Sequence, residues 1–215
     1  MSGTDPYAGF PEDFFRRDDE RPDELFYGPP RLVTHIDDDA LAAVGALYAE
    51  LGIDGWAPRP QRVLDLMSSW ISHFRTPPAE LVVLGMNAAE LAANTAATER
   101  VVQDLNADPR LPLPDEDVDA AVCCVSIDYL TRPIEVLEEI GRVLRPGGTL
   151  AITFSNRCFP TKAVRGWLLT DDEQHAALVA ELVRRAGRFT EPEVSLRTPP
   201  GRGDPLYAVV ATRLP

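Results

Sequence analysis

The apolar stretch Gln61–Leu66, with the sequence Q-R-V-L-D-L, constrains the fold more than any other part of the chain. Its branched and bulky residues lead into an acid, Asp65, and Ser68 and Ser69 follow shortly after it. This order is typical of a buried parallel strand that leads into a helix, because serine caps helix N-termini and a continuous apolar run is covered on both faces. We therefore predict a strand at 63–66 and a helix that begins at Ser68.

Strand and helix patterns alternate through the rest of the chain. Further strands are predicted at 81–84, 99–103, 117–127 and 149–155, and helices at 88–94 and 134–144. Residues 162–186 have a helical pattern in two pieces, and two final strands at 189–196 and 206–212 are predicted to pair antiparallel. This alternation predicts a doubly wound α/β sheet of the Rossmann-like type.

The N-terminal thirty residues combine prolines and charges, which disfavour regular structure, with an unusual number of aromatic residues. These aromatic residues are Tyr7, Phe10, Phe14, Phe15, Phe26 and Tyr27. Disordered tails are poor in aromatic residues, so this arm is expected either to pack on the domain or to cover a pocket. A helix is predicted to follow Asp37–Asp39. The expected organisation is an arm and helix at 1–55, packing on or capping a core domain at 56–215.

Composition limits the function classes. A chain of 215 residues that is 45% hydrophobic can bury one sizeable core. Its net charge of -13 argues against nucleic-acid binding, which needs clustered Lys and Arg. No apolar run approaches the ~20 residues that span a bilayer, and the N-terminus lacks a signal-peptide pattern, so we expect a cytoplasmic protein without membrane contact.

Cysteines and histidines add little chemistry in this sequence. The chain has three cysteines, an odd number, and Cys123 and Cys124 are adjacent in an apolar run, which argues against a disulfide framework. His35, His73 and His175 are far apart in the sequence, and no C-x-x-C motif is present. We therefore expect no metal site.

Two motifs carry a resemblance to a known family. The run L-P-L-P-D-E-D-V-D-A-A-V at 111–122 leads into the fourth strand, and L-R-P-G-G-T-L at 144–150 precedes the fifth. With the order of elements over 61–212, they resemble the class I S-adenosylmethionine-dependent methyltransferases, subgroup methyltransferase type 11. The resemblance implies a seven-stranded sheet with an antiparallel last strand. It also implies S-adenosylmethionine as the cofactor, bound at the carboxyl ends of the strands.

The glycine-rich loop of that family is altered here. In the family, an acid at the end of the first strand begins a D-x-G-x-G-x-G loop. Asp65 keeps the acid, whereas Met67, Ser69 and Ile71 stand at the glycine positions. Side chains there hinder close backbone approach, so cofactor binding is displaced, remodelled or absent. We expect Asp65, Met67, Ser68 and Ser69 to form this part of the site, with the serines at a helix N-terminus.

The resemblance implies further cofactor contacts at the ends of later strands. Asn87 follows the second strand, near the position of the acid that accepts the ribose hydroxyls. Asp104 and Leu105 match the adenine pocket, where the acid takes the exocyclic amine and the next N–H meets the ring. Val125 and Ser126 correspond to the end of the fourth strand, near the transferred methyl group.

The acceptor side is marked less clearly. Methyl transfer needs proximity, and needs a base only when the acceptor keeps its proton at neutral pH. The candidate catalytic residues are His35, Asp128 and Tyr129. The candidate acceptor-binding residues are Tyr27, Asn156, Arg157 and Lys162. The cationic side chains among them suit an anionic acceptor, and capping or charge balance is the structural alternative.

Three functions remain open from the sequence. The preferred one is methyl transfer to a small-molecule acceptor, with the aromatic arm closing over it. The second is a methyltransferase-fold protein that no longer transfers methyl groups and serves as a partner-binding or regulatory module. The third keeps the cofactor for a cyclisation or elimination. Binding of S-adenosylhomocysteine separates the second from the others. The sequence makes no prediction of the oligomeric state.

Overall fold

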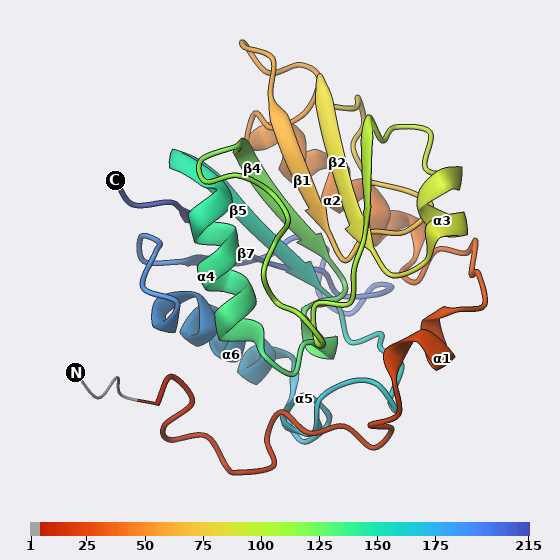
Figure 1. The fold of residues 1–215 in the computed structure, drawn as a ribbon, viewed down its shortest axis with the longest axis vertical. Coiled ribbons are helices and arrows are strands. Elements are labelled where there is room, and N and C mark those ends of the chain that lie inside the picture. The colour runs from red at the N-terminus through yellow and green to blue at the C-terminus, as the bar shows by residue number, and fades with distance from the viewer. Residues whose placement is uncertain (1–4) are drawn as a thin grey trace.

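The computed structural model describes residues 5–215, which fold around one seven-stranded sheet with the order β3-β2-β1-β4-β5-β7-β6 (Figure 1). The strands are β1 (Arg62–Leu66), β2 (Glu80–Gly85), β3 (Glu99–Val102), β4 (Val118–Cys124), β5 (Leu144–Phe154), β6 (Glu193–Leu196) and β7 (Tyr207–Thr212). β1 to β5 are parallel, and β7 is antiparallel to both of its neighbours. The predicted Rossmann-like sheet with an antiparallel last strand is confirmed.

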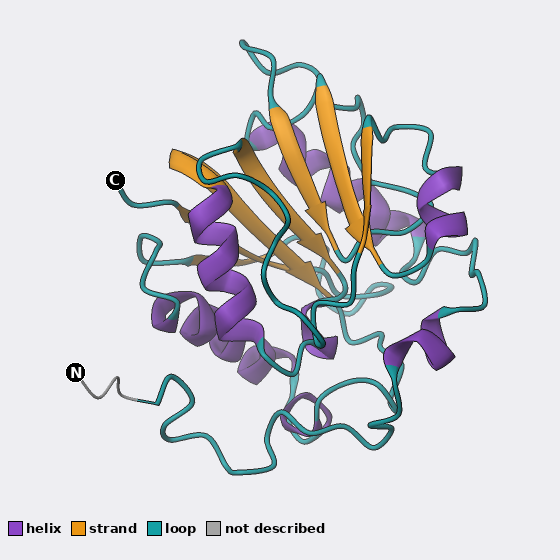
Figure 2. Cartoon of the chain, in the orientation of Figure 1, coloured by secondary structure: helices purple, strands orange, loops and turns teal. Residues whose placement is uncertain are grey.

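Helices cover both faces of the sheet (Figure 2). They are α1 (Asp23–Tyr27), α2 (Asp38–Glu50), α3 (Ala88–Ala93), α4 (Pro133–Val143), α5 (Arg165–Leu168) and α6 (Asp172–Arg185). Alternate residues of β1 point to opposite faces of the sheet. Leu64 and Leu66 pack in the hydrophobic cluster under α4 and α6, and Val63 packs in the cluster under α2. The sheet is therefore buried on both sides, as its continuous apolar strands predict.

The predicted helix at Ser68 is wrong. Residues 67–79 between β1 and β2 are irregular. The hydroxyls of Ser68 and Ser72 donate to the carboxylate of Asp65 instead of capping a helix. The backbone N–H of Ser68 donates to the carbonyl of Leu84 on β2. These bonds draw the chain back over the strand ends, so no helix N-terminus lies at this point.

A glycine on β2 permits this path. A Cβ on Gly85 would lie 2.2 Å from the carbonyl oxygen of Ser68, far inside van der Waals contact. The chain thus makes its close backbone approach at the end of β2, and not at the positions held by Met67, Ser69 and Ile71.

Most other predicted elements are present with shifted ends. β4 stops at Cys124, earlier than predicted, and a 3₁₀ turn follows at Ile127–Tyr129. Asp37 caps α2 by accepting from the N–H of Ala40. The predicted break near Thr170 separates α5 from α6. Within residues 5–215, no helix has the length and apolar character needed to cross a membrane.

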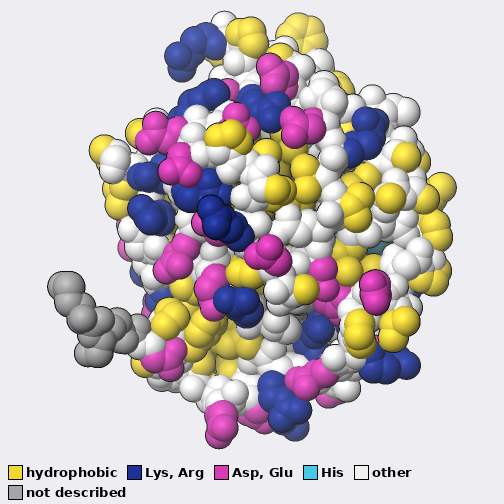
Figure 3. Space-filling view, viewed as in Figure 1, with side chains coloured by type: hydrophobic (Ala, Val, Ile, Leu, Met, Phe, Trp, Pro, Cys, Tyr) yellow, Lys and Arg dark blue, Asp and Glu magenta, His cyan; other side chains and the backbone are white. Residues whose placement is uncertain are grey.

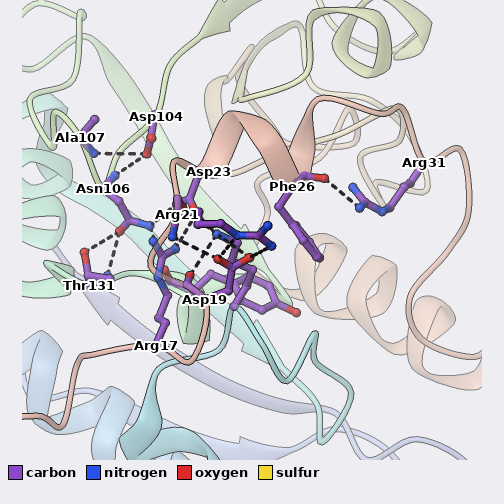
Figure 4. A network of polar contacts seen from close by, with 12 residues as sticks. Arg17, Asp19, Arg21, Asp23, Phe26, Arg31, Asp104, Asn106, Ala107 and Thr131 are labelled. Atoms are coloured by element: carbon purple, nitrogen blue, oxygen red, sulfur yellow. Dashed lines mark hydrogen bonds and ion pairs between the residues drawn. The ribbon is translucent and has the colours of Figure 1, made fainter.

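The N-terminal arm is fixed to the domain by a buried ion cluster (Figure 4). Both carboxylate oxygens of Asp23 lie 2.8 Å from Nη1 of Arg17, and Nζ of Lys162 lies 2.9 Å from Oδ1. Nδ2 of Asn106 donates to Oδ2 at 2.9 Å. The Lys162 side chain is 0% exposed. Asp23 belongs to the arm, Asn106 to the loop after β3 and Lys162 to the loop after β5. Separating these segments would leave buried charges without partners, which is costly, so the cluster holds the arm to both loops.

The surface shown in Figure 3 carries Lys and Arg side chains interspersed with Asp and Glu. Many such side chains of the protein pair: Nη2 of Arg184, for example, lies 2.7 Å from a carboxylate oxygen of the exposed Glu191. Exposed pairs of this kind contribute little to stability. The net negative charge is therefore spread over this face rather than concentrated at one site.

Candidate functional site

A cavity of about 460 Å³ lies at the carboxyl ends of the central strands. Asp65 on β1, Gly85 on β2, Asp104 after β3 and Cys124 on β4 line one side of it. Arm residues between 23 and 36 and loop residues 156–160 line the other. Open α/β sheets bind their ligands at this edge, and the volume suits a cofactor-sized molecule.

Fourteen of the sixteen predicted site residues line this cavity. They are Tyr27, His35, Asp65, Met67, Ser68, Ser69, Asn87, Asp104, Leu105, Val125, Ser126, Tyr129, Asn156 and Arg157. The other two, Lys162 and Asp128, lie outside its lining. Lys162 is corrected from an acceptor ligand to a structural residue, because its ammonium is enclosed with Asp23.

Asp65 organises the segment after β1. Its Oδ2 accepts from Oγ of Ser68 at 2.7 Å and from Oγ of Ser72 at 2.5 Å. Asn94 supports the same segment, since its Nδ2 donates to Oγ of Ser72 at 2.9 Å and to the carbonyl of Ser69 at 3.1 Å. Burial raises the pKa of Asp65 to about 6, although the serine hydroxyls favour its charged form. Asp65 is therefore mostly ionised at neutral pH, and its buried charge lowers the stability of the folded state.

The end of β2 is used by the arm. Oδ1 of Asn87 accepts from the N–H groups of Ala89 and Glu90, and its Nδ2 donates to the carbonyls of Tyr27 and Gly28. These four bonds use the whole hydrogen-bonding capacity of an asparagine side chain. Asn87 is therefore corrected from a ribose ligand to the residue that caps α3 and holds the arm.

Asp104 and Leu105 present free polar groups after β3. Oδ1 of Asp104 accepts from the N–H groups of Asn106 and Ala107, as Figure 4 shows. Among residues 5–215, neither Oδ2 of Asp104 nor the N–H of Leu105 has a hydrogen-bond partner. An acceptor and a donor on adjacent residues can bind the amine and the ring nitrogen of an adenine.

Two residues in the wall have left-handed backbone conformations. Met67 follows β1 with φ 54°, and Val125 follows β4 with φ 46°. A positive φ is uncommon for any residue with a side chain and rare for a β-branched one. Such conformations concentrate at ligand sites, where the surrounding structure holds them. Here they turn the chain sharply at the ends of the two central strands.

Two histidines face the cavity, and the sequence pointed to only one. His35 packs edge-on against Phe159, with ring centres 5.2 Å apart. Burial lowers the pKa of His35 below its usual 6.5. Burial, with a smaller contribution from His35, lowers the pKa of His73 to about 4. Both imidazoles are uncharged at neutral pH and can accept a proton. Nothing in the sequence around His73 signals this position.

The acids and phenols near β4 are not bases at neutral pH. Asp128 is buried outside the cavity lining, and burial raises its pKa to about 8. It is therefore corrected from a catalytic candidate to a buried neutral acid. Tyr129 lines the cavity, and its hydroxyl accepts from the N–H of Phe159 at 2.9 Å. Burial raises the pKa of Tyr129 well above 10, so this hydroxyl stays protonated and shapes the wall.

The arm both packs on the domain and lines the cavity. Phe14 and Phe15 pack against the core under α4 and α6. Further along, the ring of Tyr27 lies 6.5 Å from that of Tyr129, and Phe26 lies 5.3 Å from Phe159. The hydroxyl of Tyr27 is buried without a hydrogen-bond partner among the described residues. The aromatic residues of the arm therefore contact the core in one part and line the cavity in another.

The sheet order, the antiparallel β7 and a cavity across the ends of β1 to β4 define the class I S-adenosylmethionine-dependent methyltransferase fold. Residues 68–152 match the family model described as a methyltransferase domain. A methyltransferase domain of this type is therefore recognised over residues 68–152. The match begins at Ser68, directly after β1, and extends into β5.

Individual relatives are distant. The chain is 25% identical to malonyl-[acyl-carrier protein] O-methyltransferase of Methylococcus capsulatus, with 70% of this chain and 66% of the relative covered. A crystal structure of a SAM-dependent methyltransferase from Aquifex aeolicus matches with a TM-score of 0.57 and 18% identity, covering 83% of this chain and 94% of that one. The 4+2 cyclase SpnF matches with a TM-score of 0.58 and 17% identity, covering 87% and 90%. These structures share the fold.

Proposed function

We propose that this chain binds S-adenosylmethionine in the cavity and catalyses transfer of its methyl group to a small-molecule acceptor. The carrying observation is the cavity at the ends of β1 to β4, in which Asp104 and Leu105 offer an adjacent acceptor and donor. The cofactor, when bound, supplies an electrophilic methyl group on a positively charged sulfur.

The residues present fit this cofactor. Asp104 and Leu105 would bind the adenine, and the segment that Asp65 organises would contact the methionine part. Asp65, Glu90 and Asp104 place carboxylates along this side of the cavity. Carboxylates in a partly desolvated cleft favour a cationic ligand, which compensates for the missing glycines of the loop after β1.

The opposite side of the cavity is suited to the acceptor. His35 and His73 are uncharged and can take the proton of an acceptor hydroxyl or amine. His35 is the better base, because its pKa is less depressed and a base works best near the operating pH. The rings of Tyr27, Tyr129 and Phe159 exclude water from the same region.

A second candidate is a methyltransferase-fold protein without methyl transfer, acting as a partner-binding module or in a cyclisation or elimination. One observation favours it: Asn87, which follows β2, gives all of its hydrogen bonds to α3 and the arm. The side chain of Asn87 therefore has no hydrogen-bonding group left to bind a ribose hydroxyl. Transfer of a labelled methyl group separates this candidate from the first.

A calorimetric titration with S-adenosylhomocysteine tests the proposal. We expect saturable binding to the wild type and at least tenfold weaker binding to Asp104→Asn, which keeps the shape but loses the charge at the adenine contact. Asp108→Asn, four residues away and outside the cavity lining, is the matched control and should bind like the wild type. Absence of binding to the wild type at millimolar ligand would refute the proposal.

Turnover is then tested with S-adenosylmethionine carrying a labelled methyl group. The acceptors are pooled small alcohols, amines and carboxylic acids, with a malonyl thioester included because of the Methylococcus relative's name. Label in a product supports methyl transfer. Binding of the cofactor without label in any product favours the second candidate.

A further inference from the structure

Ionisable side chains of both signs line the cavity. The acids Asp65, Glu90 and Asp104 come from the strand ends and α3, on the side assigned above to the cofactor. The arginines Arg31 and Arg157 come from the arm and from the loop after β5. A further acid in the lining, Asp23, is already neutralised by Arg17 and Lys162. Glu90 accepts from the backbone N–H of Arg31 at 2.6 Å, so acids and arginines meet where α3 adjoins the arm.

Arg31 is held in place without a counter-ion. Its Nη2 donates to the carbonyl of Phe26 at 2.8 Å (Figure 4), and its guanidinium lies 4.5 Å from the centre of the Phe26 ring. The ring centre of Phe159 is 5.6 Å away. Among residues 5–215, no carboxylate lies within ion-pair distance of this guanidinium. Only two of its five N–H donors are needed for its carbonyl contacts with Phe26 and Pro29.

The charge of Arg31 acts inside the cavity. It contributes to lowering the pKa of His35, where Glu90 acts more strongly in the opposite direction. It also opposes the burial and the acids that raise the pKa of Tyr27. Both of those side chains line the cavity. An anion bound there would therefore be attracted to Arg31, in surroundings where the interaction is stronger than in water.

Arg157 stands further out on the same side. Its side chain is 64% exposed and lies 3.9 Å from Asp204, so its pairing is loose. The apolar side chains of Phe159 and Val33 also line the cavity, and the Phe159 ring lies near Arg31. Trp70 closes this region by donating from Nε1 to the carbonyl of Val33. A ligand there meets a fixed cation beside an apolar surface.

We propose that the acceptor is a small amphipathic carboxylate, whose anionic group binds Arg31 and whose apolar part packs against Phe159 and Val33. This inference rests on the proposed function. It places the acceptor along the arm, where the guanidinium of Arg31 has no ion-pair partner among the described residues, and the cofactor along the strand ends. Arg31 is then a specificity residue that the sequence did not single out.

Binding of two acids to the full-length protein saturated with S-adenosylhomocysteine tests this assignment. The probes are phenylacetate and octanoate, each compared with its uncharged amide by ligand-observed NMR and calorimetry. We expect each acid to bind at least tenfold more tightly than its amide, since a charge-assisted bond to arginine is lost in the amide. Arg31→Gln should abolish this preference. Arg202→Gln, an exposed arginine outside the cavity lining, should keep it.

Three results would overturn the inference. The first is equal binding of acid and amide, or no binding of either acid at millimolar concentration. The second is an unchanged preference in Arg31→Gln. The third is a tenfold loss of S-adenosylhomocysteine affinity in Arg31→Gln with acid binding retained, which would assign Arg31 to the carboxylate of the cofactor. Failure of S-adenosylhomocysteine to bind the wild type refutes the proposed function itself, and is seen in the first titration before any acid is added.

Discussion

Replacing Asp65 by asparagine should make the protein more stable and a poorer binder of the cofactor. The carboxylate is 5% exposed, and burial raises its pKa from the ordinary 3.8 to about 6. At ~1.36 kcal/mol per pKa unit, this difference corresponds to about 3 kcal/mol of stability lost by ionising the side chain in the folded state. The amide oxygen of Asp65→Asn can still accept from Ser68 and Ser72, so the segment after β1 should keep its path.

The sign of the effect follows from the protons bound. Between pH 4 and 6 the folded state holds the Asp65 proton more tightly than the unfolded state, so this residue makes stability fall as pH rises. The variant lacks this dependence. We therefore expect Asp65→Asn to exceed the wild type by about 1–3 kcal/mol at pH 7 and above, with the advantage disappearing towards pH 4.

Urea unfolding at a series of pH values measures this difference, and calorimetry measures the binding of S-adenosylhomocysteine. Binding to Asp65→Asn should be about tenfold weaker, because a carboxylate facing a cationic ligand is lost. Ser72→Ala is the matched control: it keeps the charge, removes one hydrogen bond to Asp65, and should lower stability by about 1 kcal/mol. A difference between Asp65→Asn and wild type that is unchanged from pH 4 to 8, or a variant less stable at pH 7, would show that the buried charge of Asp65 does not destabilise the fold.

Three further outcomes are expected. Lys162→Ala should cost about 3 kcal/mol or more in urea unfolding, because Asp23 keeps its burial and loses one cation. Gly85→Ala should cost about 1–3 kcal/mol and weaken S-adenosylhomocysteine binding, because its Cβ would displace the segment after β1; Gly52→Ala, with φ 64° and open space around it, should leave that binding unchanged. His35→Gln should lower kcat about 100-fold and abolish the acid limb of the pH–rate profile, which for the wild type falls below the depressed pKa of His35. A kcat unaffected by His35→Gln would remove it as the base.

The strands were predictable because local pattern and burial agree. β1, β2 and β4 are short apolar runs that are buried on both faces. Their alternation with helices is compatible with only a few sheet topologies. The residues at the ends of parallel strands then meet at one edge whatever the details of the loops. For this reason Asp104, Leu105 and Val125, which the family resemblance assigned to the site, line the cavity.

The errors came from contacts between distant segments. Serines after a strand are good helix caps, but Ser68 and Ser72 instead bond a buried acid that they could not be known to face. From the sequence, Lys162 is expected to be a surface cation, but in the structure it is buried in an ion pair with Asp23, which is far away in the sequence. His73 and Arg31 reach the cavity only through the path of irregular segments, for which no periodicity exists. Tertiary partners decided each of these positions.

A crystal structure of the protein grown with S-adenosylhomocysteine tests the central claim most directly. We expect the adenine beside Asp104 and Leu105 and the homocysteine over the segment from Asp65 to Ser69, with the carboxylate of the ligand away from Arg31. Ligand bound elsewhere on the molecule, or a cavity filled by Met67 and the arm with no ligand in it, would show that this cavity is not the cofactor site.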